Sequence, residues 1–178
     1  MTTPFRVRRA RTADVRGMLE LIEPYVERRI LLGKERVTLF EDIQEFRVAE
    51  TADGELIGCG ALHVIWEDLG EIRTIAVAER WLRHGVGHAL LEQLERDAEE
   101  LGLSRLFCLT FETDFFGGHG FEAIGEQLVD PEVYAELVRS PDDGVAEFLD
   151  LARVKQNTLG NTRMLKQLER REQPNLAP

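Results

Sequence analysis

A strand-like run followed by a glycine-rich turn and an amphipathic helix is the feature that most constrains this chain. Residues 69–77 form an apolar run typical of a buried strand, and a short polar loop leads from it to Gly85 and Gly87. Beyond the turn, apolar side chains recur at helical spacing at Val86, Ala89, Leu90, Leu94, Ala98 and Leu101. Gly102 then stands where a glycine commonly ends a helix. Unpaired N–H groups and the positive end of the helix dipole meet at such a turn, so the segment predicts a phosphate-binding site.

The kind of phosphate ligand is narrowed by what the turn lacks. No Gly-Lys-Ser/Thr follows the glycines, and Leu90 occupies the third glycine position of the dinucleotide-binding fingerprint. Basic side chains nevertheless gather around the turn, at Arg80, Arg83, His84 and His88. They favour a polyanionic ligand; the alternative is an ordinary solvated basic loop.

The charge balance limits the classes of partner. Lys and Arg number 22 against 33 Asp and Glu, and the net charge of −11 argues against nonspecific nucleic-acid binding. No apolar run reaches the roughly 18 residues that cross a membrane, and the first residues lack the apolar core of a signal peptide. Cys59 and Cys108 lie in separate apolar runs, which is typical of reduced core residues rather than of a disulfide or metal pair. We therefore expect a cytoplasmic enzyme for small molecules, with no membrane contact, no nucleic-acid partner and no metal.

Alternating strand and helix patterns predict one mixed α/β domain over residues 1–168, followed by a disordered tail over 169–178. Strands are expected at residues 5–8, 47–50, 55–62, 69–77 and 106–111, from residue 121, and at 144–152. Helices are expected from Thr12 to about residue 26 with a break at Pro24, at 39–46 behind a Thr38–Glu41 capping box, and at 85–101, 114–119 and 131–139. Asp53-Gly54 marks a hairpin turn between two of the strands. Residues 145–152 of the last strand would offer an edge for pairing in a homodimer.

Two strings resemble the GNAT acetyltransferases. Arg83-His-Gly-Val-Gly-His-Ala-Leu-Leu91 is similar to their motif A, Gln/Arg-x-x-Gly-x-Gly/Ala, which wraps the pyrophosphate of acetyl-CoA, although Leu82 takes its opening position. Downstream, Thr113-Asp-Phe-Phe-Gly-Gly-His-Gly-Phe121 is similar to the segment that closes over the thiol arm. The resemblance implies the GNAT acyl-CoA N-acyltransferase fold, with a central mixed sheet flanked by helices, and acetyl-CoA as cosubstrate. The residues that it assigns to acetyl-CoA are Ala76, Val77, Arg83, His84, Gly85, Val86, Gly87, His88 and Phe116.

The same resemblance implies catalytic roles. Glu71 lies on the strand before motif A, where family members often place the base for the acceptor amine, and a main-chain N–H near Ile75 would bind the thioester oxygen. Burial among apolar neighbours would raise the pKa of Glu71 towards neutrality; the alternative is an exposed charge at a strand start. His63 and His119 are rival bases. Many members protonate the departing thiolate with a tyrosine, but Phe116 stands at that position here and has no proton to donate.

Longer strings are similar to the amino-acid N-acetyltransferases of arginine biosynthesis. Among them are Ile57-Gly-Cys-Gly-Ala-Leu62, Gly70-Glu71 and Leu106-Phe-Cys-Leu-Thr110, and phenylalanine at the Phe116 position occurs in that family too. The resemblance implies acetyl transfer from acetyl-CoA to the α-amine of L-glutamate, with L-glutamine as an alternative acceptor. The chain resembles the short stand-alone synthases, which lack the kinase-like domain that binds arginine.

A dicarboxylate acceptor in an acidic protein needs dedicated cations. Lys34 takes the position of the arginine in the family motif Leu-Leu-x-Arg, and Arg73 shares a strand face with Glu71 by two-residue alternation. The expected substrate-binding residues are Lys34, Arg36, Arg73, Lys155 and Asn157, each with a solvated surface position as its alternative. Two other functions stay open. One is a GNAT enzyme that acetylates a polyamine, an antibiotic or a protein N-terminus, and the other is a non-catalytic acyl-CoA-binding sensor.

Overall fold

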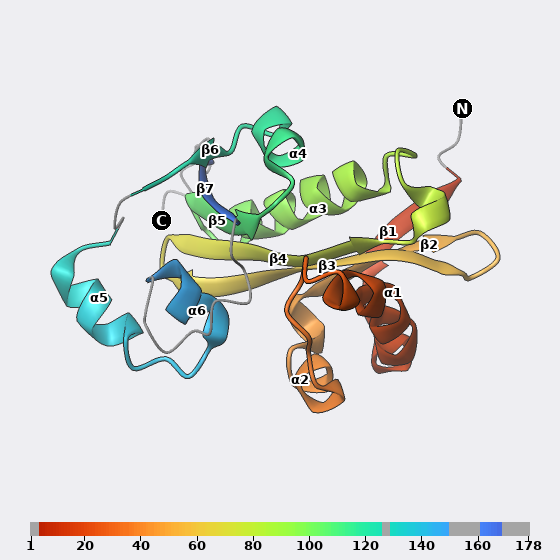
Figure 1. Ribbon diagram of the computed structural model, residues 1–178, viewed down its shortest axis with the longest axis horizontal. Coiled ribbons are helices and arrows are strands. Elements are labelled where there is room, and N and C mark those ends of the chain that lie inside the picture. Colours follow the sequence, from red (N-terminus) through yellow and green to blue (C-terminus); the bar gives the residue numbers. More distant parts are fainter. Residues whose placement is uncertain (1–3, 126–128, 150–160, 169–178) are drawn as a thin grey trace, which may run out of the picture.

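In the computed structural model, residues 4–125, 129–149 and 161–168 are described. Their seven strands form one sheet in the order β1-β2-β3-β4-β5-β7-β6 (Figure 1). The strands are β1 (Phe5–Arg9), β2 (Phe46–Thr51), β3 (Leu56–Trp66), β4 (Leu69–Val77), β5 (Arg105–Thr110), β6 (Glu122–Ala123) and β7 (Thr162–Gln167). The helices are α1 (Val15–Glu27), α2 (Arg36–Glu41), α3 (Val86–Glu100), α4 (Thr113–Gly118), α5 (Pro131–Leu137) and α6 (Asp143–Phe148). Neighbouring strands run antiparallel except β4 and β5, which are parallel. This architecture confirms the predicted mixed α/β class.

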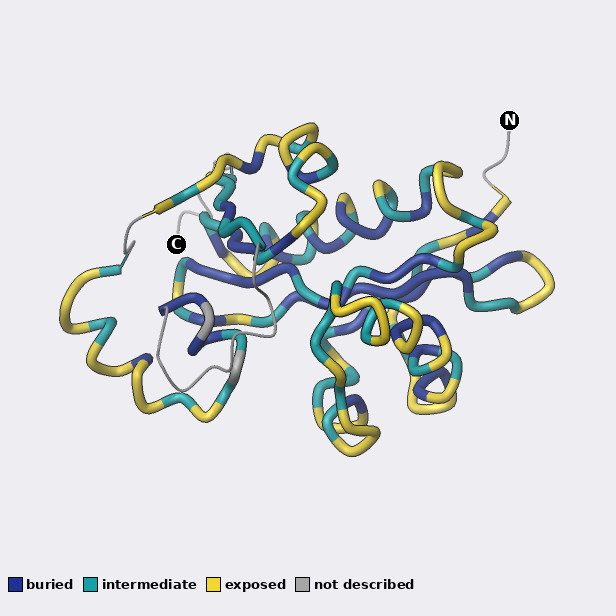
Figure 2. The backbone as a smooth tube through the Cα atoms, viewed as in Figure 1, coloured by how far each residue is buried: buried dark blue, intermediate teal, exposed yellow. Residues whose placement is uncertain are grey.

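Helices cover both faces of the sheet. α3 lies along one face and α1 along the other (Figure 1). Leu91 and Leu94 of α3 are fully buried against one face, and Met18 and Ile22 of α1 are buried against the other. Burying each such side chain contributes about 1.5–3 kcal/mol. Figure 2 shows the resulting band of buried backbone along the central strands, so the sheet is a well-packed platform for the loops at its edge. None of the helices in the described ranges is long and apolar enough to cross a membrane.

Strand β4 carries one extra residue relative to β3. Between the pairs Cys59–Ala76 and Ala61–Arg73, β4 advances by one residue more than β3, which defines a β-bulge. Thr74, inside the bulge, has a φ of +59°, a conformation that is rare for a β-branched residue. Backbone outliers of this kind cluster at functional sites.

The bulge lies close to the point where β4 leaves β5. The two parallel strands pair over Leu69–Glu71 and Arg105–Phe107, and no further pair follows in the described chain. At the far end of β4, the hydroxyl of Tyr25 in α1 hydrogen-bonds the main chain of Val77. β4 therefore has an open edge between Glu71 and Val77.

The structure agrees with the predicted strand–turn–helix unit and with the hairpin. α3 begins directly after Gly85, whose φ is +82°, and Gly102 with a φ of +84° follows its last residues. Gly54, with a φ of +89°, turns the chain between β2 and β3. Only glycine adopts these positive φ values without strain, so local sequence was sufficient to locate the three turns.

The predicted strand over residues 144–152 is wrong. Asp143–Phe148 form helix α6, and the last described strand, β7, covers Thr162–Gln167, where no strand was predicted. Val145, Ala146 and Phe148 are buried in this helix, and a short apolar run of this length is compatible with either structure. The strand edge expected to pair in a homodimer is therefore absent from the described part of α6. Residues 150–160 and the predicted tail lie outside the described residues.

Three helix boundaries also differ from the prediction. Pro24 does not break α1, because it stands exposed near the end of that helix, where a lost hydrogen bond is easily tolerated. Thr38 lies inside α2, whose N-cap is Glu35, so the expected capping box does not form. Thr12 belongs to a short 3-10 turn, and the N-cap of α1 is Asp14.

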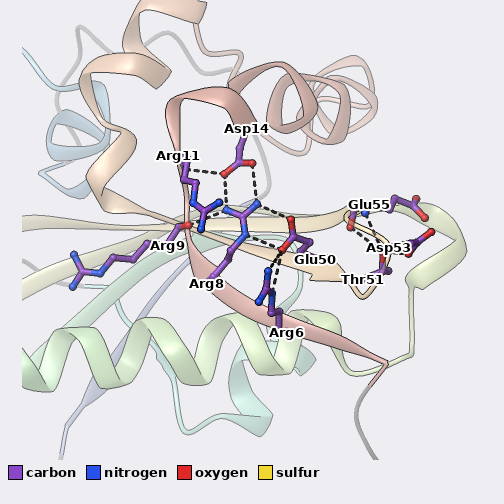
Figure 3. Close-up of polar contacts among 9 residues, drawn as sticks. All are labelled: Arg6, Arg8, Arg9, Arg11, Asp14, Glu50, Thr51, Asp53 and Glu55. Atoms are coloured by element: carbon purple, nitrogen blue, oxygen red, sulfur yellow. Dashed lines mark hydrogen bonds and ion pairs between the residues drawn. The ribbon is translucent and has the colours of Figure 1, made fainter.

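An ion-pair network ties the first strand to the first helix (Figure 3). The guanidinium of Arg8 in β1 donates to Asp14 at 2.7 and 3.0 Å and to Glu50 of β2 at 2.9 and 3.0 Å. Arg6 donates to Glu50 as well. These hydrogen bonds lower the pKa of Glu50 to about 2 and also lower the pKa of Asp14. The network holds the start of α1 against the sheet, and α1 in turn carries Tyr25 to β4.

Candidate active site

A cavity of about 410 Å³ lies beside the bulged part of β4, a size typical of small-molecule sites. Its walls come from β4, from the connection between α1 and α2, and from the segment that enters α6. The lining residues are Ile30, Leu31, Leu32, Gly33, Lys34, Glu35, Thr38, Asp42, Glu71, Ile72, Arg73, Thr74, Leu109, Pro141, Asp142, Gly144 and Asn161. The sheet therefore supplies one rigid wall, and segments outside it supply the others.

Glu71 is the buried carboxyl of this cavity. Glu71 is 4% exposed, and its Oε2 atom has no hydrogen-bond partner among the described residues. Burial raises the pKa of Glu71 to about 7, and the nearby Arg73 guanidinium opposes that rise. The alternative of an exposed charge at a strand start is thus wrong. A carboxyl that titrates near neutrality and lines a cavity is suited to general base catalysis.

Arg73 lies beside Glu71, on the same face of β4 as the alternation predicted. Its Nη1 atom lies 3.0 and 3.1 Å from the two carboxylate oxygens of Asp142 and 3.6 Å from Oε2 of Glu71. Its Nη2 atom lies 3.3 Å from Glu45. The positive charge of Arg73 is therefore compensated inside the protein.

Lys34 is the contrasting cation. It lines the cavity, and no ion pair or hydrogen bond of its ammonium group is found within the described ranges. Burial lowers the pKa of Lys34, and the charge of Arg73 lowers it further. Arg36 is exposed and does not line the cavity, while Lys155 and Asn157 lie outside the described residues. Of the predicted acceptor ligands, the structure brings together Lys34 and Arg73.

The two rival bases lie outside the cavity lining. Nδ1 of His63 is 2.7 Å from Glu45. Burial lowers the pKa of His63, but the Glu45 hydrogen bond and nearby carboxylates outweigh it and raise the pKa overall. His119 contacts His88 at 2.6 Å, and burial lowers its pKa. Across the described ranges, no group of three or more His, Cys, Asp or Glu side chains is placed to hold a metal ion.

The glycine turn forms the second part of the candidate site. Gly85 is the N-cap of α3, and its carbonyl oxygen accepts a hydrogen bond from the Ala89 N–H. The N–H groups of residues 86–88 therefore lie at the open N-terminal end of the helix. The side chain of Val86 is buried in the core, so only its main chain faces a ligand there. Nδ1 of His84 contacts the Leu82 carbonyl oxygen, and Arg80 is paired with Glu55.

Phe116, one of the residues predicted to contact acetyl-CoA, is buried. Its ring is 7% exposed and packs edge-on against Phe115 and Phe121 in the core beneath α3. Phe116 thus anchors α4 in the core, and its contact with acetyl-CoA stays a prediction.

Most of the cavity lining was not predicted from the sequence, including Asp142, Gly144 and Asn161. The first two stand in a Ser-Pro-Asp-Asp-Gly string that reads as an ordinary turn. Asn161 directly precedes β7 and stands four positions after the predicted ligand Asn157. Asp142 and Asn161 show no local signal beyond polarity, and the fold brings these residues to the cavity from far along the chain.

The fold and this site define a GNAT acetyltransferase. Residues 16–121 match the acetyltransferase (GNAT) family, and the chain belongs to that family of enzymes. It is 55% identical over 161 residues to an amino-acid acetyltransferase of Mycobacterium tuberculosis. The matched region covers 89% of this chain and 92% of that protein. A crystal structure from the same organism, in complex with CoA and NLQ, superposes with a TM-score of 0.89 at 54% identity over 92% of this chain and 99% of the other.

Longer relatives share the same region. An amino-acid acetyltransferase of Pseudomonas putida is 40% identical over 133 residues, which are 74% of this chain and 30% of that protein. The N-acetylglutamate synthase of Neisseria gonorrhoeae, complexed with coenzyme A and N-acetyl-glutamate, superposes with a TM-score of 0.75 at 28% identity. The match covers 96% of this chain and 36% of that one. These findings confirm the predicted family, fold and enzyme class.

Proposed function

We propose that this enzyme transfers the acetyl group of acetyl-CoA to the α-amine of L-glutamate or L-glutamine, as the first step of arginine biosynthesis. The observation that carries the proposal is the buried Glu71 carboxyl, with a pKa of about 7, in one cavity with Lys34, a cation that has no ion pair within the described ranges. An α-amino acid presents an amine and a carboxylate to such a pair. The names of the similar proteins, amino-acid acetyltransferase and N-acetylglutamate synthase, support the same reaction.

Acetyl-CoA fits the second part of the site. Its pyrophosphate would bind the N–H groups at the start of α3, with Arg83, His84 and His88 supplying positive charge. Its arm would run from there along the open edge of β4, past Val77 and Ala76, to the bulge. The N–H of Ile75 would then donate to the thioester oxygen, and one such donor contributes about 3 kcal/mol to a transition state.

The chemistry follows from this placement. The acceptor arrives as an ammonium ion whose carboxylate lies near Lys34, and the Glu71 carboxylate takes one proton from it. The amine nitrogen then bonds to the thioester carbon, and the carbon–sulfur bond breaks with its electron pair on sulfur. The nitrogen loses its remaining extra proton to solvent, and because Phe116 has none to give, the thiolate takes its proton from solvent as well. The products are the N-acetyl amino acid and CoA.

The test is steady-state CoA release from acetyl-CoA with glutamate, glutamine, ornithine, spermidine and a basic peptide as acceptors. We expect release with glutamate or glutamine. Glu71→Gln should lower kcat by about 10²–10⁴-fold, and Lys34→Ala should raise the KM for the amino acid. Release with spermidine or peptide alone would contradict the acceptor assignment. Tight acetyl-CoA binding without release for any acceptor would instead indicate a non-catalytic acyl-CoA sensor.

A further inference from the structure

Asp142 connects three parts of the site. It precedes α6 and accepts a hydrogen bond from the Val145 N–H at 3.0 Å, which caps that helix. Its side chain lines the cavity. Both of its carboxylate oxygens also accept hydrogen bonds from Nη1 of Arg73. A residue of the chain's last third thus holds the guanidinium group that stands next to Glu71.

The charges around the cavity give this contact a consequence. Arg73 faces the carboxylates of Asp142, Glu45 and Glu71, so its charge is already matched before an acceptor binds. Of these partners, Asp142 and Glu71 line the cavity, whereas Glu45 is not among the lining residues. A ligand carboxylate that approaches Arg73 from the cavity therefore meets the negative charge of Asp142, which already binds Nη1 of Arg73.

The remaining cavity charges point the same way. Lys34 is the lining cation without a partner in the described ranges, while Glu35 and Asp42 add negative charge to the lining. One ligand carboxylate is matched by Lys34. A second ligand carboxylate has to compete with Asp142 for the guanidinium of Arg73. The two carboxylates also repel each other at close range, and burial strengthens that repulsion.

We propose that Asp142 determines acceptor specificity by occupying the guanidinium of Arg73, and so disfavours dicarboxylate acceptors relative to their monocarboxylate amides. This inference rests on the proposed amino-acid acetyltransferase function. It assigns the discrimination between glutamate and glutamine to the residue that holds the guanidinium of Arg73.

Asp142→Asn tests the proposal with little change in shape. The asparagine oxygen still accepts from the Val145 N–H and from one Arg73 N–H, but the negative charge is gone. We expect the ratio of kcat/KM for glutamate to kcat/KM for glutamine to rise at least about fivefold, as is reasonable for removing one repulsive charge in a binding site. An unchanged or smaller ratio would overturn the proposal. Asp142→Glu keeps the charge and should return the ratio towards that of the unchanged enzyme.

Asp97→Asn is the matched control. Asp97 binds Arg47 through two contacts of 2.5 and 2.6 Å, a guanidinium pair outside the cavity lining, and the substitution removes the same charge. It should leave the acceptor ratio unchanged even if it lowers the melting temperature. If Asp142→Asn does not fold, Asp142→Ser, which retains a good helix cap, should show the same rise.

The two proposals fail in different ways. If the unchanged enzyme acetylates neither glutamate nor glutamine, the proposed function is wrong. If it acetylates either one and Asp142→Asn leaves the ratio where it was, the function stands and the role of Asp142 is wrong.

Discussion

The Tyr25 hydroxyl donates to the Val77 carbonyl oxygen at 2.7 Å and accepts from the Val77 N–H at 3.2 Å. Both main-chain groups lie on the open edge of β4, where the arm of acetyl-CoA is proposed to run. On that proposed path, the Tyr25 side chain and the cosubstrate would compete for the same main-chain atoms of Val77.

Tyr25→Phe should accordingly bind acetyl-CoA more tightly. The cosubstrate would no longer have to displace the hydroxyl, whose hydrogen bonds are each worth about 0.5–1.5 kcal/mol net. We expect the Kd for acetyl-CoA, measured by calorimetry, to fall about threefold or more. Tyr134→Phe, on α5, is the matched control and should leave the Kd unchanged. Weaker binding by Tyr25→Phe would show that the hydroxyl supports the bound state instead.

The activity should depend on pH through Glu71. Burial raises its pKa to about 7, so the base form that accepts a proton is depleted below that value. We expect kcat/KM for the acceptor to rise with pH through about 7. Arg73, Asp142, His63 and Lys34 are the charged or titratable groups that act on this carboxyl. Glu71→Gln should lose the limb near 7 along with most of the activity, whereas His63→Gln should keep the limb. A limb that survives in Glu71→Gln would assign it to another group.

The same burial should cost stability. The pKa of the Glu71 carboxyl is about 7 in the folded protein, against an ordinary value of 4.5 for an exposed carboxyl. Its contribution to folding stability is therefore fully present below pH 4.5 and is lost as the pH rises through about 7. Glu71→Gln stays neutral, so it should be more stable than the unchanged protein at pH 8, by at most about 3 kcal/mol. Urea unfolding at pH 8 and pH 5 measures the difference, which should shrink at the lower pH. Equal stabilities at pH 8 would mean that the ionised carboxylate is better solvated than its burial implies.

Gly144 should not tolerate a side chain. A methyl group there would overlap Oε2 of Glu71 and lie 3.1 Å from Nη1 of Arg73. We expect Gly144→Ala to lower kcat about 10–100-fold, since small displacements of a catalytic group cost that much, with the Kd for acetyl-CoA unchanged. Gly125→Ala, where a methyl group meets nothing within 4 Å, is the control and should retain full activity. Full activity in Gly144→Ala would show that the α6 segment yields without moving Glu71.

The network of Arg8, Asp14 and Glu50 should set the acid limit of stability. Hydrogen bonds from Arg8, and then from Arg6, lower the pKa of Glu50 to about 2. Its contribution is present above the ordinary pKa of 4.5 and is lost as the pH falls towards 2. Glu50→Gln should therefore flatten the fall of stability between pH 4.5 and 2 in denaturant titrations. Glu20→Gln, which breaks an exposed pair with Arg16, should leave that slope as it is.

The local sequence pattern was enough to predict those helices, strands and turns whose geometry is set by a few neighbouring residues. The turn at Gly85, the helix that follows it and the hairpin at Gly54 all depend on glycine conformations and on a repeat that one stretch of sequence displays. α6 was predicted as a strand because a short apolar run has no decisive period. Its helical form depends partly on the cap that Asp142 provides.

The candidate site was predictable only in part, because some of its contacts join residues that are far apart in the sequence. Glu71 and Lys34 stand in recognisable strings, and the structure places both in the cavity. The compensation of Arg73 is a contact across 69 positions of the chain, so the sequence shows a cation without showing that its charge is matched. Gly144 likewise becomes important only because the fold lays it against a carboxylate on another element.

The division of the cavity walls has an evolutionary consequence. The proposed donor site consists of main-chain groups of β4 and α3, which many sequences can supply as long as the bulge and the glycine turn persist. The cavity proposed for the acceptor has one wall from β4, and much of the rest comes from residues 30–35 and from Pro141, Asp142 and Gly144, outside the sheet. Such an enzyme can exchange its acceptor by replacing two short peptide segments while inheriting its acyl-donor machinery intact. Chimeras that swap only those segments between family members would be the natural way to redirect its chemistry.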